Sequence, residues 1–185
     1  MTSPLTAQQI IPAREKDIPV LQYLCRQTFL ETFTDTNTAQ DMQEYLDKNF
    51  NATQLLREME QPSSHFFIAF WDAVPAAYLR INEPSAHTEA GYPDALEIHR
   101  LYVLKAHKGR RIGRTLMEHA LQFARQKQLK SAWLGVWEHN EPALRFYRKM
   151  GFEVTGKHTF VLGQDRQTDL IMTRPLADTD DHGTF

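Results

Sequence analysis

One stretch of the chain, residues 96–113, carries residue types that could bind an anion and move a proton. Its first part, 96–103, is an extended and mostly apolar run that predicts a central strand, and it holds one acid, Glu97. Its last part, 108–113, is a basic loop with two glycines, after which apolar residues recur at helical spacing. A strand that leads through such a loop into a helix presents free N–H groups and the positive end of the helix dipole to an anion.

The segments before this stretch must position it. Capping residues and apolar stripes predict three helices, followed by two strands joined by a turn and then by a polar loop. The helices are predicted at 17–33 with Asp17 as N-cap, after Thr38 as a second N-cap, and at 51–60; the strands at 8–12, 65–71 and 76–81, the turn at 72–75 and the loop at 82–93.

The segments after it predict the rest of an α/β fold. The helix that follows the basic loop should continue to about residue 127, and a short apolar run is typical of a buried strand. Another helix should begin after Asn140 and end at Gly151, because these residue types favour the two ends of a helix. The remaining strands are predicted at 132–136, 152–160 and 168–173, with a polar turn around Gly163.

Length and composition are typical of one compact globular domain, with 185 residues, 42% hydrophobic and 24% charged. We therefore predict a single domain over residues 1–176, followed by an acidic, disordered tail over 177–185. A net charge of −2 and a pI of about 6.4 argue against a protein that binds nucleic acid.

The distribution of a few residue types predicts the compartment. The single cysteine, Cys25, cannot form an intramolecular disulfide, and on an apolar helix stripe it is expected to be a packed core thiol. The N-terminus lacks the features of a signal peptide, and no apolar run is long enough to span a membrane. The eight histidines are scattered without metal-ligand spacing. We expect a cytoplasmic protein that needs neither a membrane nor a metal.

The order of elements over residues 96–160 resembles the GCN5-related N-acetyltransferase (GNAT) superfamily. The pyrophosphate loop of that family, Gln/Arg-x-x-Gly-x-Gly/Ala, falls on residues 108–113. Lys108 stands where the family has Gln or Arg, and Arg111 replaces the first glycine. Arg111 implies either backbone angles that are open to non-glycine residues or a slightly remodelled loop.

A second motif makes the resemblance more specific. Asn140-x-x-Ala143-x-x-x-Tyr147, followed by residues 148–152, is similar to the second motif of the superfamily. The segments 29–33, 133–138 and 167–172 resemble bacterial PaiA-type polyamine acetyltransferases. The resemblance implies a mixed, mostly antiparallel sheet flanked by helices, in which a splayed strand pair holds acetyl-CoA.

The same resemblance implies where acetyl-CoA would bind. A β-bulge near residues 100–102 would provide unpaired backbone groups for the pantetheine arm, and the start of the following helix would cradle the diphosphate. The N–H of Val103 would donate to the thioester carbonyl. The implied cofactor-binding residues are Leu101, Tyr102, Val103, Lys108, Gly109, Arg110, Arg111, Ile112, Gly113, Arg114, Asn140 and Lys149.

Two residues are candidates for the chemistry. A primary amine has a pKa of about 10.4, so its neutral form costs about 4.6 kcal/mol at pH 7, and some group must take the proton. Glu97 is the candidate base, acting directly or through a water, and Tyr147 is the candidate acid for the departing thiolate. The plainer alternatives are an outward-facing strand glutamate and a core aromatic. His99 could relay a proton or simply pack against a helix.

The subfamily resemblance implies a polyamine such as spermidine as acceptor. A polycation needs carboxylates away from the base, and Glu31, Asp35 and Glu83 are the candidates, with Glu89 in the same loop as Glu83. The plainer alternative is that these acids are ordinary solvated charges. Other acceptors, such as a protein N-terminus or an aminoglycoside, remain open, as does a non-catalytic regulator that only binds acyl-CoA.

Analogy with small acetyltransferases also predicts a homodimer. The aromatic residues Trp137, Phe152 and Phe160 on the last strands are the candidate interface residues.

Overall fold

The structure, a computed structural model, describes residues 8–162 and 165–176 and contains one seven-stranded sheet in the order β1-β2-β3-β4-β5-β7-β6. Neighbouring strands are antiparallel except for the parallel pair β4–β5. The predicted α/β class with a mixed, mostly antiparallel sheet is confirmed. The predicted tail at 177–185 and the centre of the turn at Gly163 lie outside the described residues.

The elements follow the predicted order closely. The strands are β1 (Gln8–Pro12), β2 (Ser64–Trp71), β3 (Val74–Asn82), β4 (Ala95–Val103), β5 (Ser131–Trp137), β6 (Glu153–Leu162) and β7 (Asp165–Pro175). The helices are α1 (Ile18–Phe33), α2 (Ala39–Asn49), α3 (Ala52–Glu60), α4 (Ile112–Gln126) and α5 (Glu141–Lys149), with short 3-10 turns η1 (Glu15–Asp17), η2 (Thr34–Thr36), η3 (Pro84–Ala86) and η4 (Lys105–His107).

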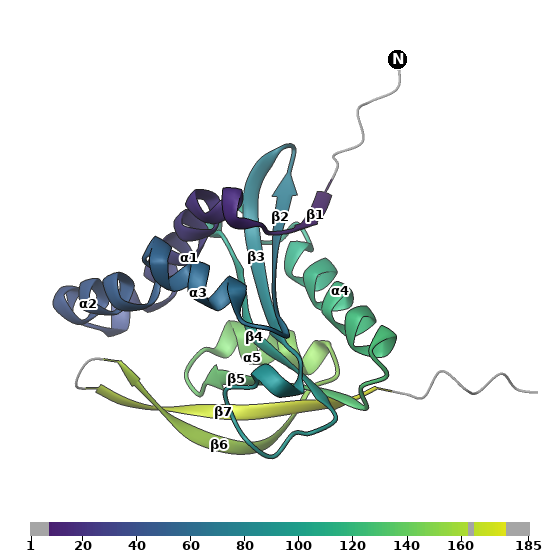
Figure 1. Ribbon diagram of the computed structural model, residues 1–185. Coiled ribbons are helices and arrows are strands. Elements are labelled where there is room, and N and C mark those ends of the chain that lie inside the picture. The colour runs from purple at the N-terminus through teal and green to yellow at the C-terminus, as the bar shows by residue number, and fades with distance from the viewer. Residues whose placement is uncertain (1–7, 163–164, 177–185) are drawn as a thin grey trace, which may run out of the picture.

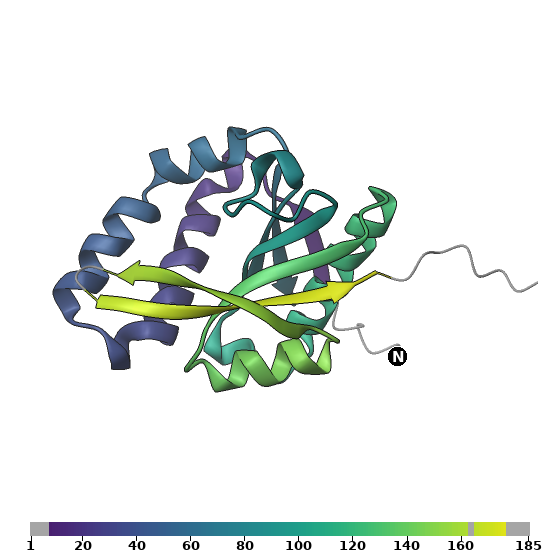
Figure 2. The same ribbon diagram turned by 90° about the horizontal axis from the view of Figure 1, so that it is seen from below.

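The sheet separates two hydrophobic clusters. Figure 1 shows α1–α3 on one side of β2 and β3 and α4 on the other. Alternate residues of β2 accordingly face opposite clusters: Phe66 and Ile68 pack with α1–α3, and Phe67 and Ala69 pack with α4. The long β6–β7 hairpin lies below this body in Figure 1 and crosses in front of it in Figure 2, which is seen from below.

Local side-chain bonds explain where the helices begin. Thr38 accepts the N–H of Asp41 at the start of α2, and Asn51 and Asn140 accept equivalent N–H groups at the starts of α3 and α5. Asp17 is the N-cap residue of α1, as predicted, but its side chain makes no capping bond to that helix. Its carboxylate instead accepts the N–H of Arg14 at the start of η1.

The two halves of the sheet are joined by a short seam. β4 and β5 pair only at Ala95–Ser131, Leu96–Ala132 and Glu97–Trp133. Beyond Glu97 the strands diverge, while β5 remains paired with β7 as far as Trp137. The predicted splayed strand pair is therefore present, and it opens where the candidate base lies.

The loop before α4 contains a strained residue. Arg111, the N-cap of α4, has φ 63° and ψ 8°, which is the left-handed conformation that glycine adopts without penalty. The sequence allowed either backbone angles that suit any residue or a slightly remodelled loop. The first explanation does not hold, because Arg111 has backbone angles that favour glycine. Gly109 in the same loop has φ 81°.

We expect Arg111→Gly to stabilise the protein by up to about 1 kcal/mol, because the relief of left-handed strain exceeds the added flexibility of the unfolded chain. Urea unfolding measures the change. Arg111→Ala is the matched control, since it removes the same side chain but keeps the strain, and its stability should stay near that of the wild type. A glycine variant no more stable than the alanine variant would contradict strain at this position.

Candidate active site

β4 and β5 separate after the pair Glu97–Trp133, and this gap between them is called the split below. The edge of β4 along the split carries main-chain hydrogen-bond donors. The N–H of Leu104 donates to the carbonyl of Ala76 on β3 at 2.9 Å. Because successive N–H groups of a strand point to opposite sides, those of Leu101 and Val103 point toward the side from which β5 has diverged. These main-chain groups can bind an extended, amide-containing ligand.

A β-bulge changes the face of the sheet to which side chains of β4 project. Arg80 pairs with Arg100 and Ile81 with Ile98, so His99 is the extra residue. The bulge was predicted near residues 100–102 and lies just before them, at a position that strand propensity alone does not fix. It turns Arg100 toward α3, on the side of the sheet to which Glu97 also projects.

The start of α4 forms an anion cradle beside the same opening. The first hydrogen bond of the helix runs from the N–H of Thr115 to the carbonyl of Arg111 at 3.0 Å. The N–H groups of Ile112, Gly113 and Arg114 therefore have no partner inside the helix. Together with the positive end of the helix dipole they fit a phosphate.

Gly113 packs closely against side chains of β4 and α5. A Cβ atom on Gly113 would lie 3.5 Å from Val103, 3.7 Å from Leu101 and 3.8 Å from Phe146. A methyl group fits at these distances, whereas a longer side chain would enter the space between β4 and α5.

The basic side chains around the cradle differ in their availability. Lys108 and Arg111 are exposed. Arg110 lies over the ring of Trp71 at 5.3 Å, and Arg114 forms an ion pair with Glu118 at 2.8 Å. Lys108 and Arg111 are thus the side chains best placed to move toward a diphosphate.

A basic hollow continues from the cradle between α4 and α5. Arg114 and Lys149 lie on its two walls, and its volume is about 360 Å³. Its further lining includes Arg125 and Arg174, with Glu118 as the one acid. Asn140 lies at the other end of α5, where its side-chain oxygen is used as the helix cap.

Glu97 is deeply buried and fully hydrogen-bonded. Only 3% of the residue is exposed. One carboxylate oxygen accepts the side-chain N–H of Asn82 at 2.8 Å and the main-chain N–H of Thr88 at 3.0 Å. The other accepts the hydroxyl of Thr88 in a very short hydrogen bond. The predicted base is therefore reached from solvent only through its neighbours.

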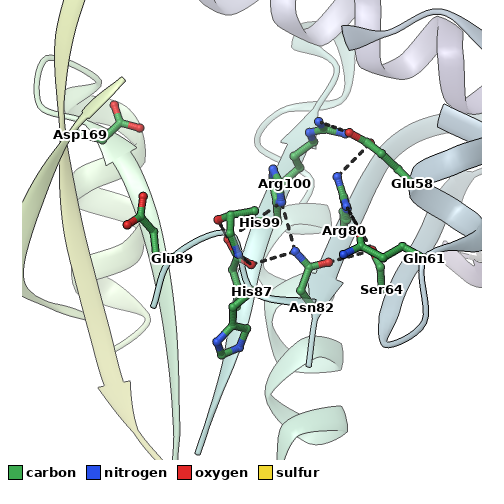
Figure 3. Close-up of polar contacts among 12 residues, drawn as sticks. Glu58, Gln61, Ser64, Arg80, Asn82, His87, Glu89, His99, Arg100 and Asp169 are labelled. Carbon is green, nitrogen blue, oxygen red and sulfur yellow. Dashed lines mark hydrogen bonds and ion pairs between the residues drawn. The ribbon is translucent and has the colours of Figure 1, made fainter. Parts of the chain in front are cut away.

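A chain of hydrogen bonds orients Asn82 toward Glu97. Arg80 Nε donates to Ser64 Oγ at 3.1 Å, and that hydroxyl donates to the Asn82 carbonyl oxygen at 2.8 Å. The Asn82 amide group must then present its N–H bonds to Glu97 and to His99 Nδ1, which is 3.2 Å away. Figure 3 shows the path from Arg80 through Ser64 to Asn82, and the Asn82 amide at its end donates to Glu97.

The series of hydrogen bonds from Asn82 back to Arg80 ends in a buried group of charged side chains. Glu58 pairs with Arg80 at 2.9 Å and with Arg100 at 2.6 Å (Figure 3). Burial opposes the ionisation of Glu58, but the two guanidinium groups outweigh it and lower its pKa. Glu58 balances one arginine, and Glu97 supplies the charge that balances the second.

His99 is held in its neutral form. Burial, with Arg100 and Arg80 nearby, lowers the pKa of His99 well below its ordinary value. Its Nδ1 atom already accepts from Asn82, so Nε2 carries the hydrogen. This arrangement favours a packed strand histidine over the predicted relay.

Tyr147 lies on α5 in the core beside Phe146 and Phe152, and burial raises its pKa to about 12. A thiol has a pKa of about 8.5, so full proton transfer from Tyr147 to a thiolate would be uphill by about 5 kcal/mol. Tyr147 can instead donate a hydrogen bond to sulfur as negative charge develops there.

The structure does not bring the three predicted acceptor carboxylates together. Glu31 accepts the N–H of Lys105 at 2.7 Å, just beyond the end of β4, and Asp35 is exposed in η2. Glu83 pairs with His65 at 2.7 Å and Lys127 at 3.2 Å, beside the opposite end of β4. At about 3.3 Å per strand residue, these two ends are on the order of 25 Å apart.

Two other carboxylates lie close to one histidine, His158. Glu89 in the 83–94 loop and Asp169 on β7 both approach His158 on β6, each at 3.8 Å, and Figure 3 shows their carboxylates on facing segments. Burial raises the pKa of Asp169 although His158 opposes the effect. In the sequence Asp169 follows three polar residues and stands directly before the apolar residues 170–172, so its signal is weaker than that of Glu97.

Several other predicted residues have structural roles. Cys25 is completely buried, and burial raises its pKa to about 11, as expected for a core thiol. Phe152 is also buried and cannot serve a dimer interface, and Trp137 packs on Phe33 at 6.1 Å. The side chain of Phe160 lies outside the described residues. The homodimer remains a prediction.

Within residues 8–162 and 165–176 no group of His, Cys, Asp or Glu side chains is arranged to hold a metal ion. The helices of the described part of the chain are too short or too polar to cross a membrane.

Comparison with known proteins identifies the relatives of this chain. The family model described as the acetyltransferase (GNAT) family matches residues 25–152. An uncharacterised N-acetyltransferase from Lactobacillus delbrueckii subsp. lactis is 38% identical over 173 residues, which are 94% of this chain and 100% of that protein. Streptothricin acetyltransferase from Streptomyces lavendulae is 39% identical over 72 residues, covering 39% of this chain and 38% of that protein.

Solved structures show the same fold. The PaiA N-acetyltransferase of Thermoplasma acidophilum, solved in complex with coenzyme A, superposes with a TM-score of 0.77 at 21% sequence identity and covers 92% of this chain and 99% of that one. At this identity the likeness concerns the fold alone.

The buried charges generate a stability prediction. We expect Glu58→Gln to destabilise the protein by about 3–5 kcal/mol, because it leaves a buried arginine without its counter-charge. The pKa of Glu58 is lowered in the folded state from its ordinary 4.5, so its contribution is present above about pH 4.5 and is lost as pH falls through the lower folded value. Urea unfolding from pH 7 to pH 3 should therefore show a larger loss of stability in the wild type than in the variant, which keeps only the contributions of other acids such as Glu83.

The control for this prediction is Glu44→Gln, which alters an exposed acid on α2. Its effect should stay within about 0.5 kcal/mol. Equal stability losses in the two variants would contradict a special role for the buried group.

Proposed function

This chain belongs to the acetyltransferase (GNAT) family and is an acetyl-CoA-dependent N-acyltransferase, and from that premise we propose that it acetylates a primary amine of a polyamine such as spermidine by direct transfer. The observation that carries the proposal is the split after Glu97, which combines an open strand edge, a phosphate cradle and a buried acid at one opening.

The residues at this opening fit acetyl-CoA. The N–H groups at the start of α4 would bind the diphosphate, assisted by Lys108 and Arg111. The N–H of Val103, at the end of β4 that leads to α4, would bind the pantetheine arm, and the N–H of Leu101, nearer Glu97, would stabilise the thioester oxygen as it becomes negative, in place of the Val103 N–H that the sequence predicted. Removing one such donor raises a barrier by roughly 3–4 kcal/mol in comparable sites.

Two side chains divide the proton chemistry. Glu97 takes a proton from the acceptor ammonium, which must become neutral before it can attack. Tyr147 donates a hydrogen bond to the sulfur of the leaving group. The amine nitrogen bonds directly to the acetyl carbon, without an acyl-enzyme intermediate. The carbon–sulfur bond then breaks and releases the thiolate.

The acceptor side favours a cation with more than one charge. Asp169 and Glu89 would hold a distal ammonium group while the terminal amine is deprotonated near Glu97. Glu31 and Asp35 lie at the end of α1 and could contact a longer acceptor. Exposed pairs contribute only about 0.2–1 kcal/mol, so the half-buried Asp169 should matter most.

A second acceptor class is favoured by one comparison. The 39% identity to streptothricin acetyltransferase over 72 residues supports an antibiotic amine as the alternative acceptor. Its partial coverage ranks it below the polyamine. Both acceptors would use the same acetyl-CoA site.

We expect acetyl-CoA to raise the melting temperature of the wild type, because a ligand of the native state adds about 2.7 kcal/mol at a hundredfold excess over Kd. Gly113→Asp should bind at least tenfold more weakly, since its side chain would enter the space between β4 and α5 and bring negative charge to the diphosphate. A melting titration measures both.

Gln122→Asp is the matched control, because it makes the same charge change at an exposed position further along α4. It should keep the full shift. No shift in the wild type, or equal shifts in the two aspartate variants, would argue against this acetyl-CoA site.

We expect Asp169→Asn to raise KM for spermidine by roughly 5- to 30-fold, corresponding to about 1–2 kcal/mol, while kcat changes little. Thiol release measured with spermidine, a monoamine and streptothricin gives both constants and ranks the acceptors. The monoamine KM should not change, because a monoamine has no distal charge.

Asp94→Asn serves as the control, since Asp94 is an exposed acid paired with Lys130 at 3.3 Å. Its KM values should match those of the wild type. Turnover of other amines without any turnover of spermidine would leave the enzyme class unchanged and overturn the polyamine.

A further inference from the structure

The hydroxyl of Thr88 bridges solvent and the buried acid. Thr88 is exposed, whereas Glu97 and its other partner, Asn82, are buried. The Thr88 hydroxyl donates to the Glu97 oxygen that Asn82 does not contact. A proton that moves between the cleft and Glu97 can therefore pass through this hydroxyl without opening the core.

Anchoring the loop does not explain this hydroxyl. The 83–94 loop is already fixed by the ring of His87, whose Nε2 is 2.9 Å from the carbonyl of Ala95, and by Tyr92, which stacks on Trp133 at 4.6 Å. The main-chain N–H of Thr88 adds a bond to Glu97 at 3.0 Å that any residue could make. The hydroxyl is thus an extra contact aimed at the acid.

A hydroxyl has the chemistry that this position requires. It can donate its hydrogen to one group while it accepts a hydrogen from another, which an N–H group cannot do. The competing route through His99 is blocked, because its Nδ1 accepts from Asn82 and lies 4.0 Å from Glu97.

We propose that Thr88 is a positioning residue that relays the acceptor's proton to Glu97. The inference rests on the proposed function of Glu97 as base. A water in the cleft takes a proton from the acceptor ammonium and gives one to Thr88 Oγ, while the Thr88 hydroxyl gives its own to the carboxylate. The result is a neutral amine and a protonated Glu97.

The remaining steps balance this transfer. The amine lone pair forms the bond to the acetyl carbon, the carbon–sulfur bond breaks, and the thiolate takes the second nitrogen proton as the amide forms. Glu97 returns its proton to solvent by the same route. One ammonium and one acetyl-CoA give one acetamide, one free thiol and one proton.

The test is a pH profile of kcat for wild type, Thr88→Val and Thr88→Ser with the best amine substrate. Valine keeps the shape and the main-chain bond but removes the hydroxyl, and serine restores it. We expect Thr88→Val to lose at least 10-fold in kcat at pH 7 and less than about 3-fold at pH 9.5, where about 300 times more amine is already neutral. Thr88→Ser should recover most of the loss.

The pH dependence must belong to the amine and Glu97. The other charged or titratable groups facing Glu97 are His99, which stays neutral, and Arg80, which stays paired with Glu58. Neither changes charge between pH 7 and 9.5. Melting curves with acetyl-CoA should show that every variant is folded and binds the donor.

A double-mutant cycle separates a relay from a structural role. In the Glu97→Gln background, Thr88→Val should cost no more than about 2-fold further, because the hydroxyl has no acid left to serve. The relay would be overturned if the kcat losses of Thr88→Val and Glu97→Gln multiplied in the double variant. It would also be overturned if Thr88→Val lost the same factor in kcat at every pH. So would a valine variant as active as the wild type.

The same assays distinguish failure of the proposed function. If the wild type acetylates no amine, the proposed function falls and the relay falls with it. If Glu97→Gln is unimpaired, Glu97 is not the base and the relay is excluded. If Glu97→Gln is impaired while Thr88→Val is fully active, the relay is overturned and the proposed function stands. Thr155→Val, at an exposed threonine on β6, controls for the loss of a hydroxyl elsewhere.

Discussion

The end of main-chain pairing between β4 and β5 is the constraint on which the site depends. Had the strands stayed paired beyond Glu97, carbonyl groups of β5 would occupy the N–H groups of Leu101 and Val103. Because β5 is held on its other side by β7, the divergence leaves a donor-lined opening within a continuous sheet. The start of α4 reaches the same opening, so one backbone feature serves both ends of an extended ligand.

The buried charges explain how an acid can be kept beside that opening. Two arginines and two glutamates balance each other across β3, β4 and α3, and the hydrogen bonds between them leave Asn82 a single useful orientation. Such groups often contribute little net stability, and their value is to specify one arrangement of the core. The negative charge of Glu97 therefore has a structural partner in Arg80 as well as a chemical use. A substitution of Arg80 should therefore alter the hydrogen bonding of Glu97, and a substitution of Glu97 should alter the environment of Arg80.

What the sequence could predict was mainly local. Caps such as Thr38 and Asn140 use hydrogen bonds within one turn, and apolar periodicity marks each strand, so the element order and the fold class were predicted correctly. Features that depend on residues far apart in the sequence were not predicted correctly. The bulge lay one residue earlier than expected, and Glu83 pairs across the fold with Lys127. Asp169 was missed because its neighbour His158 belongs to another strand. The chemical roles of the site residues remain proposals.

The insertion of β7 between β5 and β6 has a consequence for biosynthesis. As the chain leaves the ribosome, β5 emerges before β7, and its three pairs with β4 are too few to hold it. Until β7 arrives, the apolar residues 132–136 form an unprotected edge of the kind that attracts other nascent chains. The geometry that opens the strands for a ligand therefore also leaves β5 with an exposed edge until β7 pairs with it.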